Sequence, residues 1–331
     1  MPMNYKLDTN AIINSLRDAF LVPRDYDAII ARLTKTLNRL PKGRLQITHT
    51  HNGVFFYLEG RYLRKSSDLI YSLARRRYCE TLLQVIRLCA RHQAGTSSNS
   101  PFLTGWARAF EKLERLIRDF SKGNLKLERI LLTPQQYTWY YGRYHKKMFP
   151  QDPAASVLLI PQGDPVRSKS EQRIGIELHN YAVPCHYEEQ LLINVQSLVQ
   201  SLKAELKQQD QLPRDLYSYQ GYSCIWNVPR ELSWMNAPGS IWRSYDDRTG
   251  CLTLYPDYTI MLADGRLLYW EHEGMLHQFF YRTNALERVE IMQQSGRIPK
   301  TCIIETNEQQ ANDLDVLREI IRNRILPYLW F

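Results

Sequence analysis

Two acidic residues flank a predicted β-hairpin, and their types suit metal chemistry. Asp257 precedes one apolar run and Glu271 ends the next, while Ala263-Asp264-Gly265 between them suits a three-residue turn closed by a left-handed glycine. If Leu262 pairs with Arg266, Asp257 stands opposite Glu271 on the same side of the sheet. Two such carboxylates repel each other unless a proton or cation lies between them, so the pattern predicts a site for a hard divalent ion. The alternative is an exposed hairpin with surface acids.

The sequence around this hairpin predicts the elements that position the two acids. A helix opens at Ser168, which is available as its cap, and carries Glu171 in its first turn. The remaining predicted elements are a short strand within 182–188, the hairpin itself, a helix over 279–294 stopped by Gly296, a strand over 300–305 and a last helix over 313–325. The predicted order is therefore α-β-β-β-α-β, followed by a helix.

Three of these segments resemble a known family. Glu171 on the first helix, Pro256-Asp257 on the second strand and Tyr269-Trp270-Glu271-His272 on the third are similar to the PD-(D/E)XK nuclease superfamily, and more narrowly to a little-characterised bacterial branch of it. The resemblance covers about residues 165–325. It implies a restriction-endonuclease-like αβββαβ core in which Asp257 and Glu271 bind Mg²⁺ or Mn²⁺ and Glu171 orients water or a second ion. The implied reaction is phosphodiester hydrolysis.

The chain also departs from the pattern of that superfamily. Glu273 stands where the superfamily has a lysine, and strand alternation places it on the face of Glu271, where it is a further candidate metal ligand. Arg288 matches the position of a lysine in the narrower branch, and an arginine can clamp a phosphate but cannot transfer a proton as a lysine does. Lys169 is another candidate for the missing cation. His272 belongs to the branch pattern, and a packing role is as compatible with it as a catalytic one.

The charge of the chain favours a polyanionic partner. Lys and Arg number 43 against 34 Asp and Glu, which gives a formal net charge of +9. We expect this partner to be nucleic acid, DNA rather than RNA. The candidate phosphate contacts are Arg167 beside the first helix, the triplet Arg75-Arg76-Arg77 in a helix predicted over 66–91, and Lys146 and Lys147 after an aromatic stretch at 137–144. A solvated helix face and core packing are the respective alternatives for the triplet and the aromatic stretch.

The chain divides into two predicted domains. Residues 1–150 are mainly helical with a small β-hairpin around Asn52-Gly53, and they would bind substrate or a partner. Residues 151–331 form the nuclease-like domain, with an aromatic-rich insertion at about 191–253. That insertion is either a contact surface or a satellite subdomain whose aromatic residues are its own core.

Several absences narrow the prediction further. The six cysteines are scattered without a C-x-x-C pair, and neither a signal peptide nor a run of eighteen apolar residues is present. We therefore expect a cytoplasmic protein that does not engage a membrane. No G-x-x-x-x-G-K loop occurs, so a nucleotide cofactor is not expected. The leading hypothesis is a metal-dependent endonuclease. The alternatives are a non-catalytic nucleic-acid-binding or assembly subunit, and a component of a recombination or defence complex. A homodimer and another protein partner both stay open.

Overall fold

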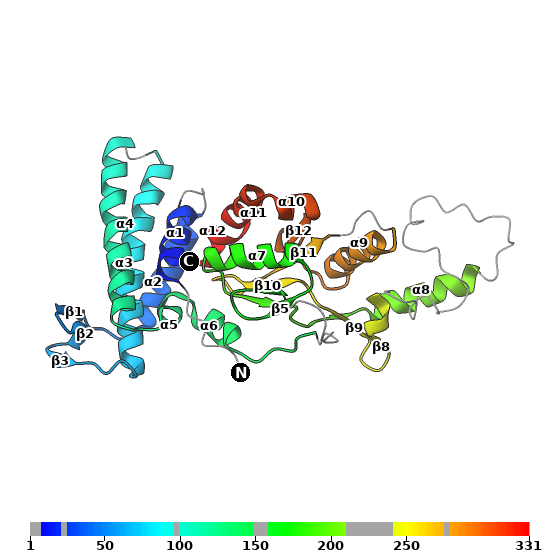
Figure 1. Cartoon of the computed structure of the whole chain (residues 1–331), viewed down its shortest axis with the longest axis horizontal. Coiled ribbons are helices and arrows are strands. Elements are labelled where there is room, and N and C mark those ends of the chain that lie inside the picture. The colour runs from blue at the N-terminus through cyan, green and yellow to red at the C-terminus, as the bar shows by residue number, and fades with distance from the viewer. Residues whose placement is uncertain are drawn as a thin grey trace.

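The protein is a mixed α+β structure built around a four-stranded sheet (Figure 1). The computed structural model describes residues 8–20, 25–95, 99–147, 158–209, 241–274 and 279–330. Among these residues, no helix has the length and apolarity needed to cross a membrane.

The amino-terminal half is mainly helical and carries a small sheet, as predicted. A long helical pair, α3 and α4, dominates it, and Ser67 caps α3 by accepting a hydrogen bond from the Leu69 amide. The small sheet has the order β1-β2-β3. The elements are α1 (Thr9–Ala19), α2 (Tyr26–Arg39), β1 (Leu45–Thr50), β2 (Gly53–Leu58), β3 (Arg61–Tyr62), α3 (Asp68–Gln93), α4 (Asn99–Lys122), α5 (Leu127–Leu131) and α6 (Pro134–Tyr140).

The carboxy-terminal half contains the predicted order of elements. Its four-stranded sheet has the order β12-β11-β10-β6, in which β11 and β12 are parallel and the other neighbours are antiparallel. The elements of this core are β4 (Leu158–Leu159), β5 (Pro165–Val166), α7 (Lys169–Asn180), β6 (Cys185–Tyr187), β10 (Tyr258–Met261), β11 (Leu267–Glu273), α9 (Phe279–Gln294) and β12 (Ile303–Asn307). The sequence α7-β6-β10-β11-α9-β12 is the predicted α-β-β-β-α-β.

The register predicted for the central hairpin is confirmed. Tyr258 pairs with Trp270, and the Leu262 amide donates to the Arg266 carbonyl over 2.8 Å. Gly265 closes the turn with φ of +89°, a conformation that a residue without a Cβ adopts freely. One further step along this ladder places Asp257 opposite Glu271, as the turn predicts.

The two faces of the sheet are covered by different elements. Trp270 and Ile304 belong to a large hydrophobic cluster that includes Ile174 of α7. Tyr269 and Ile303, which alternate with them, belong to a second cluster that includes residues of α9. The first residues of β11 and β12 are accordingly apolar without alternation, and the polar residues of both strands follow them.

The described part of the insertion forms a satellite of the second cluster. Its elements are β7 (Leu191–Asn194), α8 (Gln196–Gln209), β8 (Tyr245–Asp246) and β9 (Cys251–Leu254), with the sheet order β7-β9-β8. Trp242 is buried there, and its indole N–H donates to the Glu287 carboxylate over 2.6 Å. Trp242 is therefore a core residue and not part of a contact surface, in a cluster that it shares with β11, β12 and α9. The aromatic residues of 210–240 lie outside the described residues.

The three arginines of the triplet, which were predicted to contact phosphate, donate hydrogen bonds to backbone carbonyls within the amino-terminal half. Arg75 Nε donates to the Ile130 carbonyl over 3.1 Å. Arg76 Nη1 donates to carbonyls at the end of α2, and Arg77 donates to the Leu45 carbonyl. These bonds satisfy carbonyls that helix and strand ends leave unpaired. The contacts fit a structural role for the triplet, and its phosphate contact stays a prediction.

The end of the chain differs from the single helix predicted over 313–325. Asp313 instead caps α11 (Leu314–Ile320) after a short α10 (Glu308–Asn312), by accepting hydrogen bonds from the Asp315 and Val316 amides. A π-helical turn over Ile321–Ile325 then leads into α12 (Leu326–Leu329). Sequence periodicity does not reveal such a π turn, because it depends on tertiary packing.

The two predicted domains share one hydrophobic cluster. That cluster runs from α1 to the last residues of the chain, and the Trp330 indole N–H donates to Ser15 Oγ over 2.7 Å. Gln136 Nε2 likewise donates to the Met261 and Leu329 carbonyls, both at 3.0 Å. The predicted domain boundary between residues 150 and 151 falls within 148–157. These residues lie outside the described part of the chain, so the boundary stays a prediction.

Gly175 sets how closely α7 approaches the sheet, and this predicts a stability change. A Cβ at this position would lie 2.5 Å from Ile160 Cγ2 and 2.6 Å from Tyr258 Oη. We expect Gly175→Ala to lower the free energy of unfolding by about 1–3 kcal/mol, measured by urea denaturation, because the buried contacts must shift.

Gly105→Ala in α4 is the matched control. The nearest atom to its added Cβ is 3.8 Å away, so this change should be neutral or stabilise by up to about 1 kcal/mol. Equal unfolding midpoints for the two variants would contradict the close approach of α7.

Candidate active site

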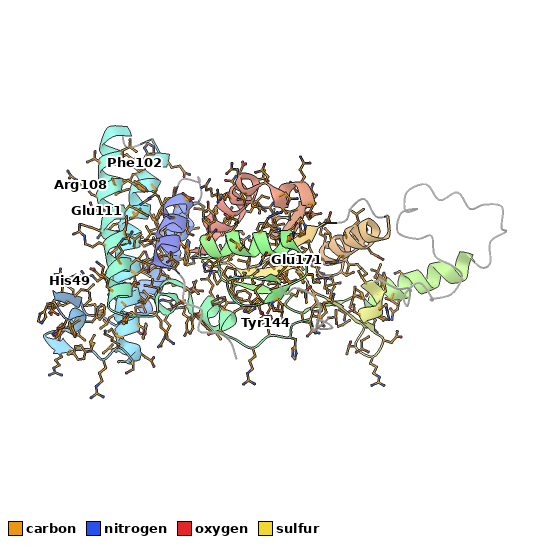
Figure 2. All side chains as sticks on the ribbon, in the orientation of Figure 1. His49, Phe102, Arg108, Glu111, Tyr144 and Glu171 are labelled. Atoms are coloured by element: carbon orange, nitrogen blue, oxygen red, sulfur yellow. The ribbon has the colours of Figure 1, made fainter. Side chains whose placement is uncertain are left out.

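Four buried carboxylates gather at one end of the four-stranded sheet. Glu171 comes from the first turn of α7, Glu188 follows β6, Asp257 precedes β10, and Glu271 lies on β11. Figure 2 labels Glu171 near the middle of the molecule, beside one end of α7. Arg167 lies beside three of these acids, and we call the set of Glu171, Glu188, Asp257 and Glu271 the acid cluster.

The start of α7 fixes Glu171 through local bonds. Ser168 caps the helix by accepting a hydrogen bond from the Glu171 amide over 3.1 Å, as predicted. Glu171 Oε2 accepts from the Arg167 amide at 3.0 Å and from the Tyr187 hydroxyl at 2.6 Å. The Tyr258 hydroxyl donates to the Glu171 carbonyl over 2.6 Å, which ties the helix to β10. The carboxylate is therefore held in one orientation.

Asp257 and Glu271 are brought together as predicted, and both are paired with cations. The His272 amide donates to Asp257 Oδ2 over 2.6 Å. Arg288 Nη1 lies 2.6 Å from Glu271 Oε2, which leaves Glu271 Oε1 buried without a hydrogen-bond partner among the described residues. Arg167 Nη2 lies 3.5 Å from Asp257 Oδ1. Each of the two acids is thus paired with one guanidinium group, Asp257 with Arg167 and Glu271 with Arg288.

Glu188 is a member of the cluster that the sequence did not single out. Its amide donates to the Asp257 carbonyl over 3.1 Å, and its Oε1 lies 2.5 Å from Arg167 Nη2. The residue is fully buried and has φ of +49°, a strained conformation for a residue with a Cβ. The available signal was its place directly after β6, because the pairing of Tyr187 with Tyr258 sets Glu188 opposite Asp257.

Burial raises the pKa values of Glu188, Asp257 and Glu271. Burial raises the pKa of Glu188 to about 7, against the opposing effect of Arg167 and Lys147. Burial likewise raises the pKa of Glu271 to about 8, opposed by Arg288. The pKa of Asp257 is raised by burial and by the nearby Glu171. The cluster therefore binds protons near neutral pH when no further cation is present.

Lys147 lies beside this cluster, which the guanidinium groups of Arg167 and Arg288 contact directly. Its amide donates to the Glu188 carbonyl over 3.4 Å, and its Nζ lies 5.8 Å from the centre of the Tyr255 ring, two residues before Asp257. Burial and Arg167 lower the pKa of Lys147, and Glu188 opposes this effect. Within the described part of the chain, Lys147 forms no ion pair with a carboxylate.

The other two candidate lysines, Lys146 and Lys169, have different surroundings. Lys146 forms an ion pair with Asp164 at 2.9 Å and lies over the Tyr187 ring. Lys169 is exposed at the first helical position of α7 and has no ion pair among the residues that the structure describes. In the aromatic stretch before them, Trp139 and Tyr144 pack on the buried His186 with ring centres 4.0 Å away, which supports the packing alternative. Tyr144 is labelled in Figure 2.

The His272 side chain lies apart from the acid cluster. The His272 side chain points to the α7 face of the sheet, where its ring nitrogens lie 3.4 Å from Thr306 Oγ1 and 3.2 Å from Glu308 Oε2. Ser170 Oγ also donates to Glu308, at 2.8 Å. Burial and Glu305 raise the pKa of Glu273 at the end of β11. The packing role weighed for His272 matches these contacts.

The acid cluster fits a divalent cation in chemistry but is not arranged around one. Among the described residues, no three His, Cys, Asp or Glu side chains are grouped as metal ligands. Arg288 and Arg167 instead occupy positions next to the carboxylates. The unpartnered Glu271 Oε1 and Glu188 Oε2 are nonetheless hard oxygen donors of the kind that Mg²⁺ and Mn²⁺ prefer. Arg288 would have to move for Glu271 Oε2 to bind a metal, whereas Oε1 has no partner among the described residues.

No match to this chain was found among protein-family models, curated proteins or solved structures. The resemblance to the PD-(D/E)XK superfamily therefore rests on the motifs and their order alone.

The raised pKa of Glu188 predicts how stability depends on pH in the absence of metal. The folded state holds this proton more tightly than the unfolded chain, so its stabilising contribution is complete below about pH 4.5 and is lost as the pH rises through about 7. We expect urea denaturation in EDTA to show a lower free energy of unfolding at pH 8 than at pH 5. Glu188→Gln should reduce this difference by about 1–3 kcal/mol.

Glu319→Gln is the control for this measurement. Glu319 is an exposed carboxylate on α11, and its loss should leave the pH dependence as in the wild type. A Glu188→Gln protein with the full wild-type pH dependence would show that Glu188 does not carry the proton.

Proposed function

We propose that the chain is a metal-dependent nuclease with a restriction-endonuclease-like core, related to the PD-(D/E)XK superfamily. The single observation that carries the proposal is the burial of four carboxylates at one end of the sheet, two of which keep an oxygen without a partner among the described residues. Buried like charges of this kind are costly unless a proton or cation joins them, and they cluster at functional sites. The substrate class is a phosphodiester of DNA, or of RNA.

The roles of the residues follow from their positions. Asp257 and Glu271 would hold Mg²⁺ or Mn²⁺, with Glu171 orienting the attacking water and Glu188 accepting a proton near neutral pH. The bound ion would polarise a phosphate oxygen and lower the pKa of the water. Lys147 and Arg167, on the side of the cluster toward β6, would bind the phosphate oxygens. Lys147 thus supplies the cation that Glu273 cannot supply on β11.

A second candidate function is binding of nucleic acid without cleavage. The observation that favours it is the Arg288 ion pair at 2.6 Å, because an arginine that permanently neutralises Glu271 would block the metal. Such a protein would bind nucleic acid with a salt dependence set by its phosphate contacts and would not respond to Mg²⁺. A subunit that cuts only within a larger complex would gain cleavage when its partner is added.

The primary proposal predicts cleavage that depends on the paired acids. Purified protein with Mg²⁺ or Mn²⁺ should cut at least one of single-stranded DNA, duplex DNA and RNA. Asp257→Asn and Glu271→Gln should each lower the rate at least about 100-fold, the scale on which loss of one charge-stabilising group acts. Glu319→Gln, on the exposed side of α11, should cut at the wild-type rate. Cleavage that survives both substitutions would contradict the site.

The phosphate role of Lys147 is tested against Lys169. Lys147→Ala should lower kcat/KM about 10- to 1000-fold, because the amine beside the cluster would be lost. Lys169→Ala removes an exposed lysine at the same end of the molecule and should change kcat/KM less than about threefold. A larger effect at Lys169 than at Lys147 would assign the phosphate contact to α7 instead.

A further inference from the structure

A second surface suited to nucleic acid lies on the small sheet of β1, β2 and β3. This sheet is at the far end of the molecule from α9, and its residue His49 is labelled there in Figure 2, well away from Glu171 (Figures 1 and 2). The surface is the side of the sheet that faces away from the core.

The strand register explains why this side is aromatic. Leu45 pairs with Leu58 and Ile47 with Phe56, and these residues pack in or against the large hydrophobic cluster. The alternating positions project from the opposite side, because successive strand residues alternate between the faces of a sheet. They are Gln46 and Thr48 on β1, Phe55 and Tyr57 on β2, and Tyr62 on β3.

Three aromatic rings cover this outer side. Tyr57 pairs with Tyr62 across β2 and β3, with ring centres 5.8 Å apart, and Phe55 lies 6.3 Å from the same Tyr62 ring. Tyr62 is 49 % exposed, whereas Phe55 and Tyr57 are half-buried. Phe56 between them already fills the core, so the outer rings are not needed there. We call Phe55, Tyr57 and Tyr62 the aromatic platform.

The segment that carries the platform is basic. Residues 42–65 contain five Lys or Arg and one acid, Glu59. Within the part of the chain that the structure describes, none of the five forms an ion pair with a carboxylate. The five are Lys42, Arg44, Arg61, Arg64 and Lys65, and all except the half-buried Lys65 are exposed. This uncompensated positive charge favours a polyanionic partner over a neutral one.

We propose that the aromatic platform binds single-stranded nucleic acid, with bases stacked on Tyr62 and its neighbours and phosphates held by the surrounding cations. Flat rings on a sheet surface accept any base, while cations follow the backbone. A duplex hides its base faces inside the helix, so this chemistry selects unpaired strands. The platform goes beyond the proposed nuclease function, because it stands on residues remote from the acid cluster.

The binding test uses the full chain with Asp257→Asn in EDTA, so that cleavage cannot affect the result. Fluorescence anisotropy with an oligothymidine of about 16 nucleotides should show binding that weakens about 5- to 100-fold in Tyr62→Ala and in Phe55→Ala. Tyr62→Leu keeps apolar bulk without a flat ring, and we expect it to lose binding as well. Replacing Arg64 and Lys65 with glutamine should flatten the dependence of log affinity on log salt by about 0.7 for each lost contact.

Tyr328→Ala is the matched control, because Tyr328 is a similarly exposed tyrosine (46 %) on α12 with Arg266 beside its ring. This variant should bind oligothymidine as the parent does, and all variants should keep the parent melting temperature. Wild-type affinity in both Tyr62→Ala and Tyr62→Leu would overturn the proposal. So would equal loss in Tyr328→Ala, or duplex DNA that binds as tightly as the single strand. These outcomes do not depend on whether the protein cleaves, since binding and cleavage are measured separately.

Discussion

The burial of four carboxylates beside one another is the constraint on which the rest of the carboxy-terminal half depends. Three of them lie close to Arg167, and the fourth is held by Arg288 from α9. Removing one member of such a buried set leaves an uncompensated charge, which costs more than a surface ion pair returns. The close packing of α7 at Gly175 and the strained backbone of Glu188 both serve to keep the acids together.

The sequence was sufficient to predict the central hairpin and the paired acids. The turn at Ala263-Asp264-Gly265 sets the register by local rules, and the register alone then places Asp257 opposite Glu271. Ser168, as a capping residue, likewise predicted where α7 begins. These predictions succeeded because each depends on a few neighbouring residues rather than on tertiary packing.

The surroundings of the site were harder to predict, since they depend on contacts distant in sequence. Glu188 enters the cluster because β6 pairs with β10 some seventy residues later, across the insertion. Lys147 belongs to the segment before the carboxy-terminal half and contacts Glu188 across a long sequence separation. Arg75 and Arg77 donate hydrogen bonds to backbone carbonyls that are likewise distant in sequence. The aromatic platform was not predicted for the same reason. The sequence predicted the hairpin, but not which of its two faces packs against the core and which carries the exposed rings.

The central claim is that the acid cluster binds a divalent cation in exchange for protons. Calorimetric titration of Mn²⁺ into the protein at about pH 6.5, in two buffers of different ionisation enthalpy, tests it most directly. Because the pKa of Glu271 is raised to about 8 and that of Glu188 to about 7, the account predicts release of at least about one proton for each ion bound. Glu271→Gln should abolish both the binding and the release. An absence of binding heat, or a heat that is the same in both buffers, would contradict the account.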